Sequence, residues 1–189
     1  MRIRTATVIA LGILTMGAAS FAGPARADQN DSRLPALFER LAKASSSDEA
    51  FEIDAKIWDI WDQAGDADID ALLANGVAAM ENGDFWTALQ QFNIVVAQRP
   101  DFAEGWNKRA ALYFYVGDFE KARADIAMTL TLEPRHMSAL LGLGAVEQRQ
   151  GHYEDAVNAY RRVLAIDPQN KTATDLLELA GTIIRRTSF

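Results

Sequence analysis

The sequence predicts an all-α fold, a solenoid of helical hairpins that repeat with a period of 34 residues. Prolines, glycines, alanines and aromatic residues all recur at this spacing. Apolar residues at helical spacing fill the intervals, so each period is expected to contain two α-helices joined by a tight turn. Five series share one register: Pro100, Pro134 and Pro168; Gly83, Gly117 and Gly151; Phe85, Phe119 and Tyr153; Ala88, Ala122 and Ala156; and Phe92, Ile126 and Tyr160.

The composition is that of a globular chain held together by packing alone. Of its 189 residues, 49% are hydrophobic and none is cysteine, which excludes disulfides, thiolate nucleophiles and zinc–thiolate sites. With 19 basic and 26 acidic residues, the net charge is −7. An acidic chain does not attract nucleic acid through its overall field, so no nucleic-acid partner is expected.

Residues 1–27 have the three-part pattern of a cleavable secretory signal peptide. Arg2 and Arg4 give a basic start, residues 6–22 are apolar, and small residues at 25 and 27 flank an expected cut before Asp28. An uncleaved membrane anchor is the alternative, which the glycines in the apolar stretch disfavour. No cysteine follows the cut, so a lipid-anchored form is excluded. We therefore expect a soluble periplasmic protein with no stable membrane insertion after signal cleavage.

A linker and a degenerate helical hairpin are expected over residues 28–68. Carried backwards, the repeat register runs from Pro35 to Asp68 and places Phe38, Trp58 and Trp61 on apolar positions. The residues 46–49, Ser-Ser-Asp-Glu, have the pattern of a capping box at a helix N-terminus. We expect this hairpin to precede the first clear repeat in the stack.

Three clear repeats follow at residues 69–102, 103–136 and 137–170. In the middle repeat, Gly117 ends the first helix because a residue without Cβ readily adopts the left-handed conformation. Asp118 then caps the second helix, and Pro134 stops it. Residues 171–189 are expected to form a capping helix and tail that cover the last apolar face.

The pattern of these repeats resembles the tetratricopeptide repeat family, and it does so over 102 residues. Departures from the family pattern include Ala79 and Glu147 at positions that are usually aromatic. Arg109 takes a leucine position, where its stem is expected to pack while its head reaches solvent. The resemblance implies a right-handed α-solenoid of an exported bacterial type. It is carried in the middle repeat by Ala103-Glu104-Gly105-Trp106, Ala110, Tyr113, Gly117-Asp118-Phe119, Ala122, Ile126 and Pro134.

Few residues suggest chemistry. The two histidines, His136 and His152, fall in different turns, so a shared metal site is not expected. Asp66, Asp68 and Asp70 alternate as at the start of a calcium loop, but the later glycine and glutamate are missing. No phosphate loop, dinucleotide fingerprint or zinc-protease motif occurs. We expect no enzyme activity and no catalytic, cofactor-binding or metal site.

The resemblance implies that the first helices of successive repeats line a concave groove for a peptide or helix of a protein partner. This groove would be mostly apolar, with Asn107 and Lys108 orienting the ligand. The carboxylate clamp of the family's chaperone-tail-binding members is not expected, because only Lys108 has a suitable charge. Carried over position by position, the groove residues are Leu73, Val77, Met80, Asn107, Lys108, Ala111, Phe114, Tyr115, Leu141, Ala145 and Gln148.

The sequence thus favours a non-catalytic periplasmic scaffold or adaptor that binds a protein. The alternative is a binder of a lipid or glycan fragment in the same groove, which the neighbouring aromatic residues Phe114 and Tyr115 suggest. The groove could also be covered, either by the leading hairpin or by a second copy of the chain in a homodimer.

Overall fold

The computed structural model describes residues 28–187, and within this range the chain forms nine α-helices and no strand. The signal peptide predicted at residues 1–27 lies outside the described residues. No helix within the described range is both long and apolar enough to cross a membrane. The helices are α1 (Leu34–Leu41), α2 (Ser47–Trp61), α3 (Ala67–Glu81), α4 (Phe85–Gln98), α5 (Ala103–Tyr115), α6 (Phe119–Leu132), α7 (Met137–Arg149), α8 (Tyr153–Ile166) and α9 (Lys171–Thr187).

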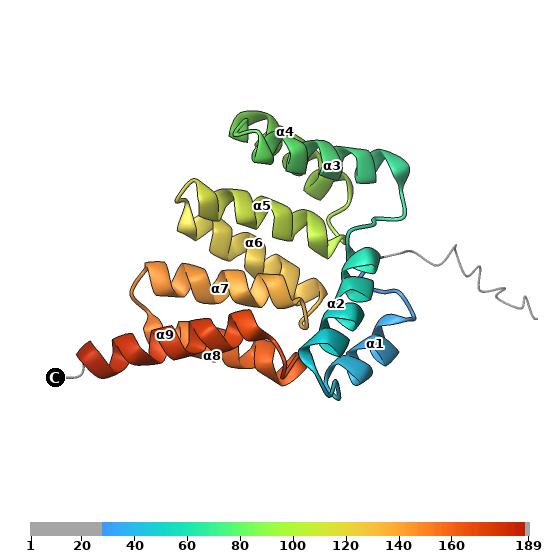
Figure 1. Cartoon of the computed structure of the whole chain (residues 1–189). Helices are drawn as coiled ribbons and strands as arrows, with labels where there is room; N and C mark the ends of the chain where they lie inside the picture. The colour runs from blue at the N-terminus through green and yellow to red at the C-terminus, as the bar shows by residue number, and fades with distance from the viewer. Residues whose placement is uncertain (1–27, 188–189) are drawn as a thin grey trace, which may run out of the picture.

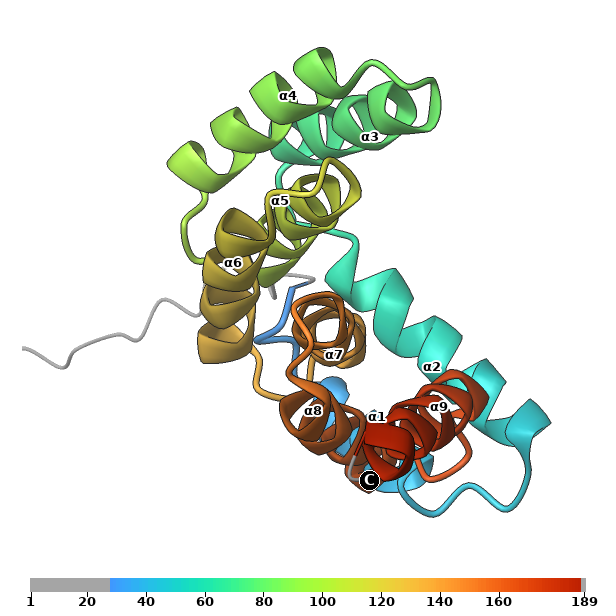
Figure 2. The same cartoon turned by 90° about the vertical axis from the view of Figure 1, so that its left-hand side faces the viewer.

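Helices α3 to α9 form an all-α solenoid of stacked hairpins (Figure 1). The pairs α3–α4, α5–α6 and α7–α8 each pack as a hairpin, and α9 packs against α8. Seen from the end in Figure 2, α4, α6 and α8 form one layer, while α3, α5, α7 and α9 form the other. The 34-residue period is therefore the period of the stack.

The turns inside repeats one and two have the same geometry, because a glycine followed by an aspartate recurs there. Gly83 and Gly117 adopt φ values of 78° and 82°, which is the left-handed region. The aspartate that follows each glycine then caps the next helix. The side chain of Asp84 accepts a hydrogen bond from the Thr87 amide at 3.1 Å, and Asp118 accepts one from the Lys121 amide at 3.3 Å.

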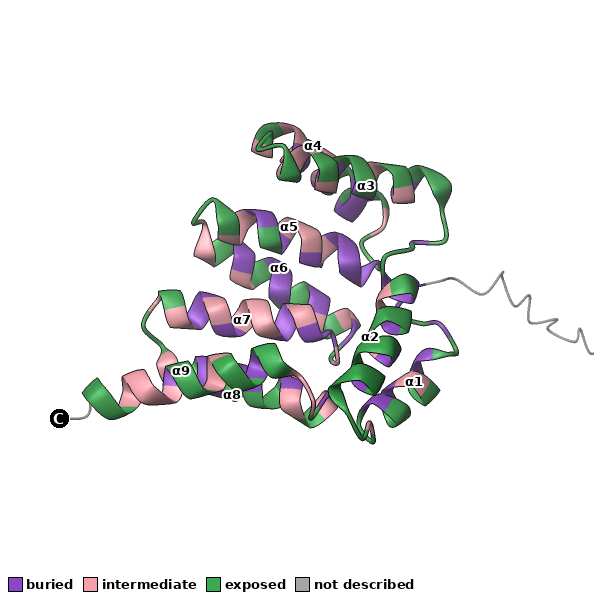
Figure 3. Cartoon of the chain, in the orientation of Figure 1, coloured by how far each residue is buried: buried purple, intermediate pink, exposed green. Residues whose placement is uncertain are grey.

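The core lies between the two layers, where buried residues meet along each hairpin (Figure 3). Ala88, Ala122 and Ala156 are fully buried, so they allow close approach of the paired helices. The large core residue Tyr160 packs over Gly144, where a Cβ atom would clash with its ring. Small and large residues thus alternate across the contact, as the repeat pattern requires.

The head of Arg109, expected to extend into solvent, is instead held by other side chains of the protein. Its guanidinium forms a two-point ion pair with Asp125, at 2.7 and 2.8 Å, and donates a further hydrogen bond to Asn93 at 2.8 Å. The Arg109 side chain is 16% exposed and lies over the Trp106 ring. The usual leucine contact is therefore replaced by a charged link between α4, α5 and α6.

The leading hairpin forms, but its position corrects the expectation that it precedes the first repeat in the stack. Helices α1 and α2 instead lie beside the stack, at the ends of α5, α7 and α9 (Figures 1 and 2). Their apolar residues Phe38, Ile57 and Trp61 share one core with Met137 and Leu140 of α7. The large side chains of this hairpin are buried there against residues of α7, α8 and α9.

Polar contacts fix the leading segment to the same edge of the stack. Gln29 donates to the Asp101 carbonyl at 2.5 Å and accepts from the Ala103 amide at 3.2 Å. At the other end of the hairpin, Gln169 donates to the Ala44 carbonyl at 3.3 Å. These contacts bridge the loop before α5 and the loop before α9, so α1–α2 spans two inter-repeat loops.

Candidate functional site

A concave surface lies between the first helices of repeats one and two, α3 and α5. It consists of two hollows of about 350 and 400 Å³. Both are lined by Val77, Glu81 and Lys108, so they form one continuous surface that we name the α3–α5 groove. The remaining lining residues are Asp62, Asp70, Leu73, Ala74 and Ala78 in the first hollow, and Met80, Phe92, Ala111 and Tyr115 in the second.

Six of the groove residues named from the sequence meet here, and five line neither hollow. The six are Leu73, Val77, Met80, Lys108, Ala111 and Tyr115. They converge because the 34-residue register places equivalent faces of α3 and α5 side by side. The other five are Asn107, Phe114, Leu141, Ala145 and Gln148.

Asn107 is held by other side chains of the protein rather than presented to a ligand. It is buried, with its amide nitrogen 3.0 Å from both a carboxylate oxygen of Glu104 and the hydroxyl of Ser138. The Ser138 hydroxyl also donates back to the Asn107 carbonyl oxygen at 3.2 Å. Asn107 therefore links α5 to α7.

Lys108 lies on the groove, but its ammonium group already has partners. Its Nζ is 2.7 Å from Oε1 of Glu104 and 3.4 Å from Oδ1 of Asp62, and it lies near the Trp58 ring. Burial alone would lower the pKa of Lys108, but the two carboxylates raise it above its ordinary value. The positive charge of Lys108 is thus already paired, and its ion pair with Asp62 joins the end of α2 to α5.

Glu104, the main partner of Lys108, belongs to a buried network below the groove. Its Oε2 lies 2.8 Å from Nε2 of His136, and neither side chain is exposed. The other ring nitrogen of His136 accepts from the Ala139 amide and caps α7. Burial would raise the pKa of Glu104, but the hydrogen bond from His136 and the charge of Lys108 hold it below its usual value. A substrate cannot reach this carboxylate–histidine pair.

Two of the residues predicted from repeat three, Leu141 and Gln148, contact other side chains of the protein. Leu141 packs between the core around α2 and the core around α9. Gln148 accepts a hydrogen bond from the Tyr160 hydroxyl at 3.0 Å. Phe114 of repeat two contacts Phe119 and the guanidinium of Arg149, so it does not share a hollow with Tyr115. The paired aromatic surface suggested for a lipid or glycan is therefore divided.

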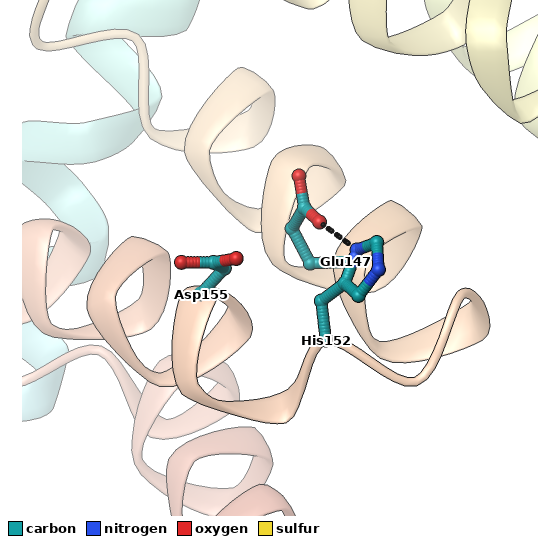
Figure 4. A group of neighbouring side chains, drawn as sticks. All are labelled: Glu147, His152 and Asp155. Atoms are coloured by element: carbon teal, nitrogen blue, oxygen red, sulfur yellow. Dashed lines mark hydrogen bonds and ion pairs between the residues drawn. The ribbon is translucent and has the colours of Figure 1, made fainter.

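A second carboxylate–histidine group lies at the turn between α7 and α8 (Figure 4). Glu147, His152 and Asp155 bring ligand atoms within 4.8 Å of one another. However, Arg123 pairs with both oxygens of Glu147, and His152 lies 2.9 Å from one of them. A metal ion would have to compete with this guanidinium, so we assign the group to an ion-pair network that joins α6 to α7.

Two features of the surface were missed at the sequence level. One is the row of carboxylates in the groove, Asp62, Asp70 and Glu81. Asp62 reaches the groove only because α2 folds beside α5, although the spacing of Glu104 and Lys108 does predict their pairing. The other is a hollow of about 620 Å³ between α1 and α2, lined by Arg33, Ala36, Leu37, Arg40, Lys56, Asp59, Ile60 and Gln63.

The sequence is similar to those of known tetratricopeptide repeat proteins. A family model described as tetratricopeptide repeat matches residues 107–171. A TPR repeat-containing protein of Rhizobium etli is 34% identical over 147 residues, which cover 78% of this chain and 72% of the relative. The small glutamine-rich tetratricopeptide repeat-containing protein 2 of Saccharomyces cerevisiae is 26% identical and covers 70% of this chain, but only 38% of the relative is matched.

Solved structures share the fold at lower identity. The first TPR of Spaghetti (RPAP3), bound to the HSP90 peptide SRMEEVD, has a TM-score of 0.60 and 23% identity. The match covers 62% of this chain and 95% of that one. The Sgt2 TPR domain from Aspergillus fumigatus has a TM-score of 0.61 and 23% identity, with coverage of 64% and 82% respectively.

Proposed function

Because the chain belongs to the tetratricopeptide repeat family, we propose that it is a non-catalytic scaffold that binds a peptide or helix of a protein partner in the α3–α5 groove. One observation carries this proposal: six residues on two consecutive first helices line one continuous, largely apolar groove. Apolar grooves between helices bind segments of partner chains through a few anchoring side chains.

Related folds support this kind of ligand. One similar domain was solved with the HSP90 peptide SRMEEVD, and the second TPR domain of human RPAP3 was solved with the HSP70 peptide SGPTIEEVD. The fold alone does not identify a partner, since one fold serves many functions. The carboxylate–histidine groups of the described residues support a non-catalytic role, because one is fully buried and the other is tied to Arg123.

A photo-crosslinking experiment in the host tests the groove. A crosslinking amino acid at Ala111, which lines the groove, should capture one defined segment of a partner protein. The matched control is the same substitution at Ala127, an exposed alanine on α6 in the other layer. The substitution Ala111→Trp should weaken partner binding about ten-fold or more, because the indole would occupy the hollow. Identical adducts from both positions would contradict a groove-directed function.

We further propose that the chain acts in the periplasm of a bacterium. The support is the basic, apolar and small-residue pattern of residues 1–27. Mass spectrometry of the protein purified from a cell-envelope fraction should find Asp28 at its N-terminus. Recovery from the cytoplasm with residues 1–27 intact would overturn this proposal.

A further inference from the structure

We infer that the α3–α5 groove selects a segment with apolar residues between basic ones, and that it rejects acidic segments. This inference rests on the proposed function and specifies the charge of the partner. It concerns three carboxylates and one ammonium group that share the lining of the groove. The carboxylates belong to Asp62, Asp70 and Glu81, and the ammonium group belongs to Lys108.

Lys108 does not offer its charge to an incoming anion. Its ammonium group lies between Glu104 and Asp62, so two carboxylates already surround one positive charge. Glu104 is fully buried, and rotation of Lys108 toward a ligand would leave that carboxylate with a weaker set of partners. The Lys108 end of the groove therefore carries net negative charge even with its lysine in place.

The other two carboxylates are available to a ligand. Neither Asp70 nor Glu81 forms an ion pair with any residue in the described range 28–187. Asp70 uses one oxygen to accept the Ala64 amide at 2.6 Å, which fixes its side chain, and the residue also lines the hollow. Glu81 lines both hollows and is exposed.

The spacing of these charges sets the length of the ligand. Asp70 and Glu81 lie near opposite ends of α3. At a rise of about 1.5 Å per residue, they are about 16 Å apart along the helix axis. An extended segment spans this distance with about five residues. Between the charges lie Val77, Met80 and Ala111, so the geometry matches two basic residues that flank a short apolar stretch.

This preference is opposite to the chemistry of the peptides in two similar structures. The peptides SRMEEVD and SGPTIEEVD both end in the acidic sequence Glu-Glu-Val-Asp. In the groove described here, such a tail would place its carboxylates beside Asp70 and Glu81. Like charges at close range repel. Lys108 would not offset this repulsion, because it already pairs with Glu104 and Asp62.

Selection from a random peptide display library tests the inference. The purified residues 28–189 serve as bait in three forms: the unaltered chain, Ala111→Trp, and the double variant Asp70→Asn/Glu81→Gln. Asparagine at 70 keeps an oxygen that can accept the Ala64 amide. The variant Glu52→Gln is the control for neutralising an acid away from the groove, because Glu52 is an exposed acid on α2 that lines none of the hollows described above.

Peptides enriched by the unaltered chain should carry Lys or Arg on both sides of an apolar stretch. The double variant should bind a synthetic copy of such a peptide about ten-fold more weakly at low salt, and Glu52→Gln should bind it equally well. Enrichment of neutral or acidic peptides that Ala111→Trp abolishes would overturn the charge preference and leave the proposed function standing. Equal enrichment by the unaltered chain and Ala111→Trp would overturn both.

Discussion

The indole of Trp61, at the end of α2, stacks face to face on the imidazole of His136, in the loop before α7. The ring centroids are 4.3 Å apart and the planes differ by 7°. Both side chains are buried, and His136 also caps α7 and contacts Glu104. One stacked pair thus joins the leading hairpin to the network that holds Lys108 at the groove.

Truncation of this stack should destabilise the whole fold. We expect Trp61→Ala to lower the free energy of unfolding by about 3–5 kcal/mol, because it removes a fully buried ring from a shared core. Phe51→Ala is the control on the same helix, since Phe51 is 74% exposed and should change stability by less than about 0.5 kcal/mol. Urea unfolding measures both, and similar losses for the two variants would contradict the docking of α2 through Trp61.

The pH dependence of stability should carry a contribution from Asp54 of α2. Burial, with the nearby charge of Asp167, raises the pKa of Asp54 from 3.8 to about 6. A pKa that is higher in the folded state adds stability that is fully present below about pH 4 and is lost as the pH rises through about 6.

Asp54→Asn should therefore stabilise the protein by about 1–2 kcal/mol at about pH 7.5, with little effect at about pH 3.5. This magnitude is discounted because the side chain is only partly buried. Denaturant unfolding across this range provides the measurement, with Asp59→Asn on the exposed side of α2 as the matched substitution. If Asp54→Asn raised the free energy of unfolding equally at both pH values, the raised pKa of Asp54 would not be the cause.

Two glycines of α7 should respond in opposite ways to alanine. At Gly144 a Cβ atom would clash with the ring of Tyr160, so Gly144→Ala should cost about 1–3 kcal/mol through overpacking. At Gly142 the nearest atom is 3.5 Å away, in Ile126. Gly142→Ala should therefore stabilise the helix by up to about 1 kcal/mol. Thermal unfolding of both variants measures the two effects. Equal effects on stability would contradict the close packing of α7 against Tyr160 of α8.

The buried ion pair between Arg109 and Asp125 should show strong coupling. Arg109→Leu restores the residue usual at this position, yet it should cost about 3 kcal/mol because Asp125 is left buried without its charge partner. The double variant Arg109→Leu/Asp125→Ala should recover a large part of this loss. A double-mutant cycle from urea unfolding gives the coupling energy. Additive effects of the two substitutions would show that the pair is not coupled.

The repeats were predictable because their signals are local. The turn glycine Gly117, the capping residue Asp118 and the buried Ala122 act within one hairpin, so a 34-residue period carries their arrangement. The same register brought Leu73 and Ala111 to one groove. The family, and an all-α solenoid of helical repeats, followed from these residues and are confirmed by the comparisons.

The position of α1–α2 was not predictable in the same way. It depends on contacts such as Trp61 with His136, between residues that no repeat register relates. The roles of Asn107 and Lys108 were missed for a related reason: their partners Ser138 and Asp62 lie on other helices. Local periodicity fixes which face of a helix is apolar, but it does not show which distant segment covers a polar one.

The hairpin beside the stack also changes how the protein should fold. A repeat array in which each unit contacts only its neighbours has nearly additive stability and opens in steps. Contacts from Gln29 to the loop before α5, and from Ala44 to the loop before α9, join segments that are far apart in the chain. We therefore expect repeats two and three to unfold as one cooperative unit and to show slow amide exchange throughout. The terminal pair α3–α4, which has a repeat on one side only, should open first and exchange fastest.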